Sequence, residues 1–345
     1  MATNRVKSNH AVVVFGGTGF IGTFFARQLA DQGAFDKIYL VDHEGLSSKP
    51  FKFRDAMLKA YPSVEFVAGD VRNEIDLDVE GEVALIANFA AVHREPGHEP
   101  SEYYETNLLG AENVCAWAEK VGCNRIIFSS SIAPYGPSEA VRDESSIPVP
   151  ETAYGGSKLA AEKIHQIWQA RDPARQLVIV RPGVVFGPGE GGNVSRLIKA
   201  VLGRYFFYMG NQNTRKAGTY VKELCRAMLW VLESEKAKSD GVSLFNMSMN
   251  PGPSIQEYVD AICRVSGKKV WVPSVPSWAL FFAARVIDLF AKPLGINHPF
   301  SPVRIRKLIR SNNILPTYLV ENGYEYQFTL EEALADWKQE CPEEW

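Results

Sequence analysis

Short apolar runs rich in β-branched residues alternate with longer segments of helical pattern over the first half of the chain. Such runs are typical of strands in a parallel sheet, because crossover helices bury both of its faces. The pattern predicts six of these strands, at Ala11–Phe15, Lys37–Val41, Val64–Ala68, Ala84–Phe89, Arg125–Ser129 and Gln176–Val180. The sequence therefore predicts an α/β fold with a doubly wound parallel sheet, whose ligands bind beyond the carboxyl ends of the strands.

The pattern becomes less regular after about Pro188. Apolar pieces at 205–209 and 242–247 are mixed with helical patterns that begin at Val221, Ser254 and Trp278. Ser254 and Glu257 have the spacing of a capping box, which predicts that a helix begins there. We expect a smaller, mixed α/β carboxyl-terminal part that packs against the sheet domain and forms a substrate cleft with it.

A glycine loop follows the first predicted strand directly, since residues 16–22 read Gly-Gly-Thr-Gly-Phe-Ile-Gly and open a helical pattern. Gly16 permits a tight turn, Gly19 lets the backbone approach a pyrophosphate, and Gly22 lets the helix pack on the sheet. The helix N-terminus offers free N–H donors to an anion. Asp42 ends the second strand twenty residues after Gly22, where a carboxylate binds ribose hydroxyls. Together these features predict a bound dinucleotide.

Asp42 also favours NAD over NADP, because its negative charge repels the additional phosphate of NADP. His43 follows it, rather than an arginine or lysine that would bind that phosphate, although Lys49 and Lys52 keep NADP open as the less favoured cofactor. Asp70 follows the third strand and is placed to bond the adenine amino group. A local turn with an Asx hydrogen bond explains Asp70 equally well.

Tyr154 and Lys158 lie four positions apart at the start of a helical pattern, so their side chains share one helix face. Ser131 follows the fifth strand, whose carboxyl end faces the predicted dinucleotide crevice. A tyrosine normally has a pKa near ~10, and work near neutrality requires about 3 to 4 kcal/mol of stabilisation of the phenolate. An ammonium about 4 Å away supplies roughly that amount at an effective dielectric constant of about 20. The alternative is an ordinary helix face with a surface lysine.

These motifs resemble the extended short-chain dehydrogenase/reductase family, particularly nucleotide-sugar epimerases typified by UDP-galactose 4-epimerase. The resemblance covers about residues 11–265 and also rests on Ser129-Ser130-Ser131, Tyr135-Gly136 and Arg181-Pro182-Gly183. It implies that Tyr154 transfers a proton, that Lys158 is its electrostatic partner and a ribose ligand, and that Ser131 donates to the substrate oxygen. The expected cofactor contacts are Gly16, Thr18, Gly19, Phe20, Ile21, Gly22, Asp42, Asp70, Val71, Ala90, Ala91, Ser129, Tyr154, Lys158 and Pro182.

On this basis we expect an NAD-binding Rossmann domain over residues 1–188, to which a helix and a strand from 217–247 could return. Residues 189–345 would form most of the substrate-binding part. Asn193, Arg215 and Lys216 are candidate contacts to a substrate diphosphate, and a solvated charged loop explains them equally well. His93 and Arg94 are assigned no catalytic role.

Ile132 and Ala133 follow Ser131 where related dehydratases carry an Asp-Glu pair, and neither can exchange a proton. This disfavours dehydration and leaves oxidation and reduction at one carbon of a nucleotide sugar. Asp42 then favours net epimerisation, of the C4 type, over net reduction, because biosynthetic reductions more often use NADPH. A nucleotide-sugar 4-ketoreductase of surface-polysaccharide synthesis is the alternative, because the segment after Arg181 and the stretch at 220–223 depart from the 4-epimerase pattern. Arg304 and Arg306 leave a 3β-hydroxysteroid-type dehydrogenase as a weaker rival. A non-catalytic NAD-binding regulator is disfavoured because Tyr154 and Lys158 are both present.

The composition of the 345 residues excludes other classes of protein. A net charge of −3 and a pI near 6.1 give nucleic-acid binding no support. Five scattered cysteines without a CxxC pair, and a polar amino terminus, indicate a cytoplasmic protein without disulfides or a metal site. The apolar stretch 278–291 contains Arg285 and Asp288 and is too short for a membrane span. It predicts a packed amphipathic helix, with an interfacial membrane or dimer helix as the alternative. The family resemblance implies a homodimer through helices near 102–120 and 154–170.

Overall fold

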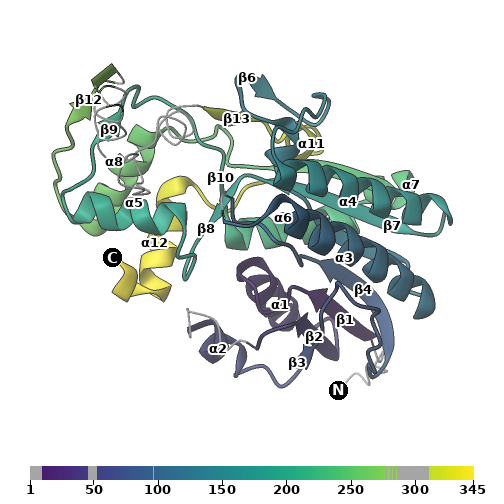
Figure 1. The fold of residues 1–345 in the computed structure, drawn as a ribbon. Coiled ribbons are helices and arrows are strands. Elements are labelled where there is room, and N and C mark those ends of the chain that lie inside the picture. The colour runs from purple at the N-terminus through teal and green to yellow at the C-terminus, as the bar shows by residue number, and fades with distance from the viewer. Residues whose placement is uncertain are drawn as a thin grey trace.

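A seven-stranded parallel sheet forms the centre of the molecule (Figure 1). The computed structural model describes residues 10–45, 53–95, 97–276, 278–279, 282, 285 and 311–345. The strands run in the order β3-β2-β1-β4-β5-β7-β11, and every pair of neighbours is parallel. Their bounds are β1 His10–Phe15, β2 Lys37–Asp42, β3 Val64–Ala68, β4 Glu82–Asn88, β5 Arg125–Ser129, β7 Gln176–Pro182 and β11 Val242–Met247. The predicted doubly wound, Rossmann-type sheet is confirmed.

Successive residues of the strands bury their side chains on opposite faces of this sheet. Val12 and Val14 of β1 belong to the core under α1 (Phe20–Gln32) and α6 (Val221–Glu233). Val13 and Phe15 belong to the core under α3 (Pro100–Lys120) and α4 (Ala153–Ala170). This alternation, with apolar residues on both faces of the inner strands, explains why these strands read as continuous apolar runs. The strand order reverses between β1 and β4, so their carboxyl ends open the crevice in which such folds bind ligands.

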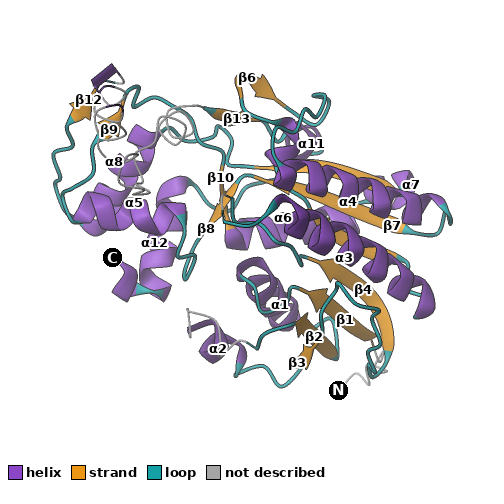
Figure 2. Cartoon of the chain, in the orientation of Figure 1, coloured by secondary structure: helices purple, strands orange, loops and turns teal. Residues whose placement is uncertain are grey.

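A smaller lobe of short strands and helices packs beside the sheet domain (Figure 2). Its helices α5, α8 and α12 lie together, and β9 pairs with β12 in parallel. The capping box of Ser254 and Glu257 is confirmed: the Ser254 hydroxyl accepts the Glu257 N–H at 3.1 Å. The remaining bounds are α2 Phe53–Leu58, η2 Ala133–Tyr135, β6 Ser138–Arg142, β8 Val184–Phe186, α5 Asn193–Leu202, β9 Tyr208–Met209, β10 Gly218–Tyr220, α7 Glu235–Asp240, α8 Ile255–Ser266, β12 Ser274–Val275, β13 Asn312–Ile314, α11 Thr317–Glu321, α12 Leu330–Glu340 and η4 Pro342–Glu344.

Some predicted strands have different bounds in the structure, and some predicted features lie outside the described residues. The fourth strand begins at Glu82 rather than Ala84, and only Tyr208–Met209 of the apolar piece 205–209 forms a strand. Most of the helix predicted from Trp278, and also Arg304, Arg306, Lys49 and Lys52, lie outside the described residues. No described helix combines the length and apolar character that a membrane span requires.

Candidate active site

The glycine loop forms an open cradle at the amino end of α1. Gly16 has a φ of +71°, and a Cβ there would lie 2.7 Å from the backbone nitrogen of Ala90. A Cβ at Gly22 would lie 2.5 Å from the Gly16 carbonyl oxygen, so a side chain would separate the helix from the loop. Gly19 is the N-cap of α1 and adds no side chain over the first-turn amides, which have no acceptor within the helix. The residues present therefore fit the pyrophosphate of a dinucleotide.

Asp42 lies at the carboxyl end of β2, next to this loop. The Thr18 hydroxyl donates to Asp42 Oδ2 at 2.6 Å, and the His43 backbone N–H donates to Oδ1 at 2.9 Å. The His43 ring lies 2.9 Å from the same Oδ1. Thr18 thus fixes the carboxylate to the glycine loop. This placement suits the predicted contact with ribose hydroxyls, and the acidic group suits NAD better than NADP.

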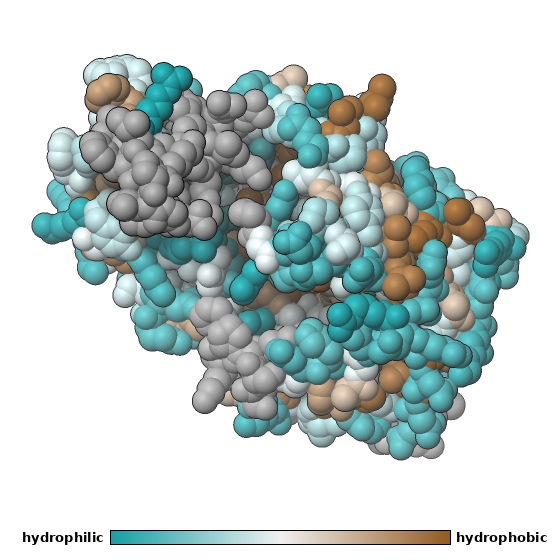
Figure 3. All heavy atoms as spheres, in the orientation of Figure 1, coloured by the Kyte–Doolittle hydropathy of each residue, from teal (hydrophilic) through white to brown (hydrophobic). Residues whose placement is uncertain are grey.

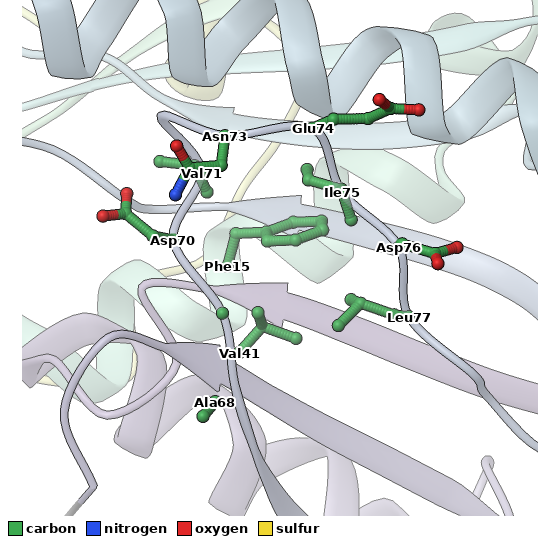
Figure 4. A pocket seen from close by; sticks show the side chains of 11 residues that line it. Phe15, Val41, Ala68, Asp70, Val71, Asn73, Glu74, Ile75, Asp76 and Leu77 are labelled. Carbon is green, nitrogen blue, oxygen red and sulfur yellow. The ribbon is translucent and has the colours of Figure 1, made fainter.

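Asp70 forms a local turn. Its Oδ1 accepts the Arg72 backbone N–H at 2.9 Å, and the Arg72 guanidinium binds both carboxylate oxygens, which holds the Asp70 pKa below its usual value. The Asx-turn interpretation of Asp70 is therefore observed, and the adenine contact stays a prediction. Figure 4 shows a pocket of about 230 Å³ beneath this loop, into which Phe15, Ile75 and Leu77 point. It is smaller than a dinucleotide site requires.

Asn107 of α3 holds the loop that follows β4 and contains Ala90 and Ala91. Its side-chain oxygen accepts the Val92 N–H at 3.0 Å, and its amide nitrogen donates to Ser157 Oγ on α4 at 2.8 Å. The loop and the helix that carries Tyr154 are therefore joined through one buried side chain. The sequence placed Asn107 in a helix but gave no sign of this positioning role.

The three predicted catalytic side chains lie together at the carboxyl end of β5. Thr152 caps α4 by accepting the Gly155 N–H at 3.1 Å, and Tyr154 and Lys158 follow one turn apart on the same face. The Tyr154 hydroxyl forms a hydrogen bond with the Ser131 side chain. The Lys158 ammonium donates to the Ser129 carbonyl oxygen at 2.8 Å and lies 4.9 Å from the centre of the Phe128 ring.

The ionisation of this cluster differs from the sequence-based expectation. Burial raises the pKa of Tyr154 to about 12, although the bond with Ser131 opposes the shift. Burial also lowers the pKa of Lys158 to about 7, against the effect of Glu162. The expectation that Lys158 alone prepares the phenol for neutral pH is therefore wrong for the protein without ligands. Both side chains lose hydration, and Lys158 is only partly charged near pH 7.

A buried ion pair lies one helical turn beyond Lys158. Glu162 accepts two hydrogen bonds from Arg181 of β7, at 2.8 and 2.6 Å, and one from the Ser130 hydroxyl at 2.5 Å. The Arg181 guanidinium stacks over the Tyr135 ring at 4.7 Å. Sequence reasoning missed Glu162, although its spacing of four from Lys158 was a visible signal. Its partner Arg181 was noted only as part of a motif.

The three candidate substrate contacts do not belong to this cluster. The Arg215 guanidinium donates to the Gly252 carbonyl oxygen and lies 3.8 Å from Glu257. The backbone of Lys216 forms an isolated parallel β-bridge with that of Asn312. Asn193 begins α5 and accepts from Arg196 at 2.7 Å. Their role in binding substrate stays a prediction.

Glu190 occupies the amino end of α5, where the predicted diphosphate contact Asn193 lies. Its carboxylate accepts both the backbone N–H and the hydroxyl of Ser195 at 2.9 Å. Burial raises the pKa of Glu190. A substrate diphosphate at this helix end would therefore meet a side chain that already caps it.

Comparison of the sequence with known proteins identifies the family of this chain. Residues 12–246 match the family described as "NAD dependent epimerase/dehydratase family", which is more than half of the chain. The chain belongs to this family. The match covers the glycine loop, Tyr154 and Lys158, and it ends within β11, the last strand of the sheet. As a member of the epimerase/dehydratase family the protein is an enzyme.

Curated relatives of this family member are sugar 4-epimerases. The N-acetyl-alpha-D-glucosaminyl-diphospho-ditrans,octacis-undecaprenol 4-epimerase of Escherichia coli O157:H7 is 28% identical over 328 residues, covering 94% of this chain and 93% of its own. UDP-glucose 4-epimerase of Bacillus subtilis is 27% identical and covers 75% of this chain and 83% of its own.

Solved structures share the fold. UDP-glucuronic acid 4-epimerase from Bacillus cereus, in complex with NAD, has a TM-score of 0.73 at 18% identity and covers 96% of this chain and 99% of its own. The UDP-Glc/GlcNAc 4-epimerase of Campylobacter jejuni has a TM-score of 0.70 at 20% identity, with 96% and 100% covered.

Proposed function

We propose that this protein is an NAD-dependent 4-epimerase that inverts one carbon of a sugar carried on a diphosphate, most simply a nucleotide sugar. The observation that carries the proposal is the cluster of Ser131, Tyr154 and Lys158 at the end of β5, in a fold whose glycine loop fits a pyrophosphate. The curated relatives described above are all named as 4-epimerases. NAD, when bound, supplies a hydride acceptor that can return the hydride, together with positive charge.

Tyr154 is the group that would take the proton of the sugar hydroxyl and later give it back. With a pKa of about 12, the phenol needs additional positive charge before it can ionise near neutrality. Charged Lys158 provides part of that potential from the same helix face, and Ser131 holds the substrate oxygen through its hydroxyl. One proton-transfer group is sufficient, because the proton that leaves the sugar hydroxyl on oxidation is returned to the same oxygen on reduction.

The neighbours of Ser131 support epimerisation over dehydration. Ile132 and Ala133 lead into the short helix η2, and the Ala133 N–H donates to Ser131 Oγ at 3.1 Å. Neither side chain can remove a proton from a neighbouring sugar carbon. Elimination of water requires such a base, whereas hydride transfer at C4 does not.

A lipid-linked sugar diphosphate is the second candidate substrate. The UDP-glucose 4-epimerase of Bacillus subtilis covers 75% of this chain, whereas the relative named for an undecaprenol-linked sugar covers 94%. The additional similarity lies outside the part shared with the UDP-glucose enzyme. The chemistry at C4 is the same for both substrates, so the two candidates differ only in what carries the diphosphate.

We also propose a cytoplasmic homodimer. Leu109 of α3 and Ile167 of α4 expose apolar side chains on adjacent helices, and Figure 3 shows hydrophobic surface gathered over this face. Such a pair of helices suits a subunit interface. All five cysteines are free thiols, which suits a reducing compartment.

The experiment is a substrate screen with purified protein and NAD. UDP-glucose, UDP-N-acetylglucosamine and an undecaprenyl-diphosphate sugar are incubated separately, and each product is separated from its C4 epimer. The proposal predicts interconversion of at least one pair without net consumption of NAD, and none with Tyr154→Phe. Stoichiometric oxidation or reduction without an epimer would support a ketoreductase instead and would overturn the proposal.

A further inference from the structure

The most exposed aromatic side chains of the described residues all lie in the carboxyl-terminal lobe. Trp271 is 84% exposed, Trp278 73%, Phe282 67% and Tyr205 66%. Single exposed apolar residues are ordinary on a protein surface, but a group of large aromatics in one lobe indicates an interaction. None of the four belongs to the cluster around Tyr154.

Strand pairing brings two of these aromatics to the same end of a small ribbon. β9 and β12 are parallel, with Tyr208 paired to Ser274, and the Tyr208 N–H donates to the Pro273 carbonyl oxygen at 2.9 Å. Tyr205 and Trp271 each precede a paired residue by three positions, so both lie in the segments that lead into the same end of the ribbon. Figure 1 shows this ribbon at the outer edge of the lobe, away from the sheet.

Basic side chains flank the two aromatics without acidic neighbours in sequence. Arg204, Lys268 and Lys269 are exposed, and segments 203–210 and 265–276 contain no Asp or Glu. None of these three cations forms an ion pair with another residue that the structure describes. The sequence that follows, 277–310, carries six Lys or Arg against one Asp. The two described segments thus carry three cations and no carboxylate on a chain whose net charge is −3.

We propose that this end of the lobe docks on the surface of an anionic phospholipid membrane. We define the docking surface as Tyr205, Trp271, Arg204, Lys268 and Lys269. Tyrosine and tryptophan rings favour the headgroup level of a bilayer, where an apolar body and a polar edge are both satisfied. The three cations complement anionic headgroups. The surface does not depend on the sugar chemistry, and it would bring the site close to a lipid-linked sugar diphosphate.

The test is sedimentation of the full chain with phosphatidylcholine vesicles, with and without phosphatidylglycerol. The expected result is strong binding only to the anionic vesicles. The double variant Lys268→Gln/Lys269→Gln should bind about 25-fold more weakly, because each cation near an anionic surface contributes about five-fold. Trp271→Ser should also lower binding, by several-fold. All variants are first checked for an unchanged thermal midpoint.

Two matched control variants distinguish binding by this docking surface from nonspecific adsorption to vesicles. Among the described residues outside the lobe, Ile147 has the most exposed large apolar side chain, at 76%, and Lys163 is an exposed lysine of α4. Ile147→Ser and Lys163→Gln should bind anionic vesicles as the unmodified protein does. Absence of binding to anionic vesicles, or equal losses in the controls, would overturn the proposal.

A second copy of the chain is the competing occupant. If Trp271→Ser converts a dimer to a monomer in sedimentation velocity without lipid, the surface is a subunit contact and the membrane proposal is wrong. Epimerisation of a water-soluble UDP-sugar, assayed without vesicles, separates the two proposals. Vesicle binding without epimerisation of any sugar diphosphate in the screen would overturn only the proposed function, and epimerisation of a UDP-sugar without vesicle binding would overturn only the docking surface.

Discussion

The face of α4 that covers the sheet and the outer tip of the carboxyl-terminal lobe use polar groups in opposite ways. Around α4, Lys158, Glu162 and Arg181 are almost completely buried, and each has a specific hydrogen-bond partner. At the tip, Trp271 and Lys268 face solvent. The contrast reflects two different requirements. Proton transfer requires polar groups held at fixed positions in a site of low dielectric, whereas docking on a fluid membrane requires only exposed aromatic and cationic side chains.

The largest expected effect is the loss of activity on removing the Tyr154 hydroxyl, which belongs to the region around α4. Tyr154→Phe deletes the hydroxyl that bonds Ser131 and leaves the ring in place. We expect kcat to fall about 10³-fold, the usual contribution of a positioned general acid or base, with NAD binding retained. Steady-state kinetics and NAD titration measure both quantities. An active variant would show that the proton travels by another route.

The buried ion pair should dominate stability. Glu162→Gln leaves the Arg181 guanidinium buried without its counter-ion, which typically costs about 3 to 5 kcal/mol of the free energy of unfolding. The matched control is Glu235→Gln, which breaks an exposed pair with Lys238 and should not move the denaturation midpoint measurably. If urea denaturation gave equal losses of unfolding free energy for the two substitutions, the buried ion pair would be no more important for stability than the exposed one.

Lys158 should give the cofactor-free protein a characteristic pH dependence. Its folded pKa, about 7, lies below the ordinary lysine value of 10.5, so the unfolded chain binds more protons between these limits. The free energy of unfolding should therefore rise with pH, by about 2 kcal/mol from pH 7 to pH 9 for this group.

Lys158→Met provides the comparison for that pH dependence. The methionine variant should lose this part of the rise and be about 1 kcal/mol more stable at pH 7, while its kcat falls. Chemical denaturation across this pH range checks the sign. A rise of equal size in the methionine variant would contradict the assignment.

The smallest effect on stability belongs to the exposed region. Trp271→Ser removes a side chain that is 84% exposed, so we expect the free energy of unfolding to change by less than about 0.5 kcal/mol. Epimerisation of a soluble substrate should also be unchanged. A large loss of stability would show that Trp271 packs against the protein in solution.

The sequence predicted the part of the molecule in which local pattern and tertiary structure agree. The glycine loop, Asp42 and the Tyr154/Lys158 spacing follow from backbone and helix geometry, so the structure places them as the pattern indicates. It could not reveal that Arg181 pairs with Glu162, because the contact joins a strand to a helix nineteen residues away. The parallel pairing of β6 with β13 joins segments more than 160 residues apart, and no local signal announces it.

The pKa of Tyr154 shows a second limit of sequence reasoning. Spacing alone gives the distance between a phenol and an ammonium, but not the hydration that both lose. Lys158 turns its ammonium to the Ser129 carbonyl, and burial raises the Tyr154 pKa rather than lowering it. The charge of a bound cofactor therefore has more to contribute than the sequence indicated.

The central claim is that C4 is inverted by removing a hydride and returning it to the same carbon. A UDP-hexose that carries deuterium at C4 tests this most directly, with the epimer analysed by mass spectrometry after reaction in ordinary water. Full retention of deuterium in the epimerised product is predicted. Replacement of the label by solvent hydrogen would mean that C4 is inverted as a carbon acid, and the proposed roles of NAD and Tyr154 would be wrong.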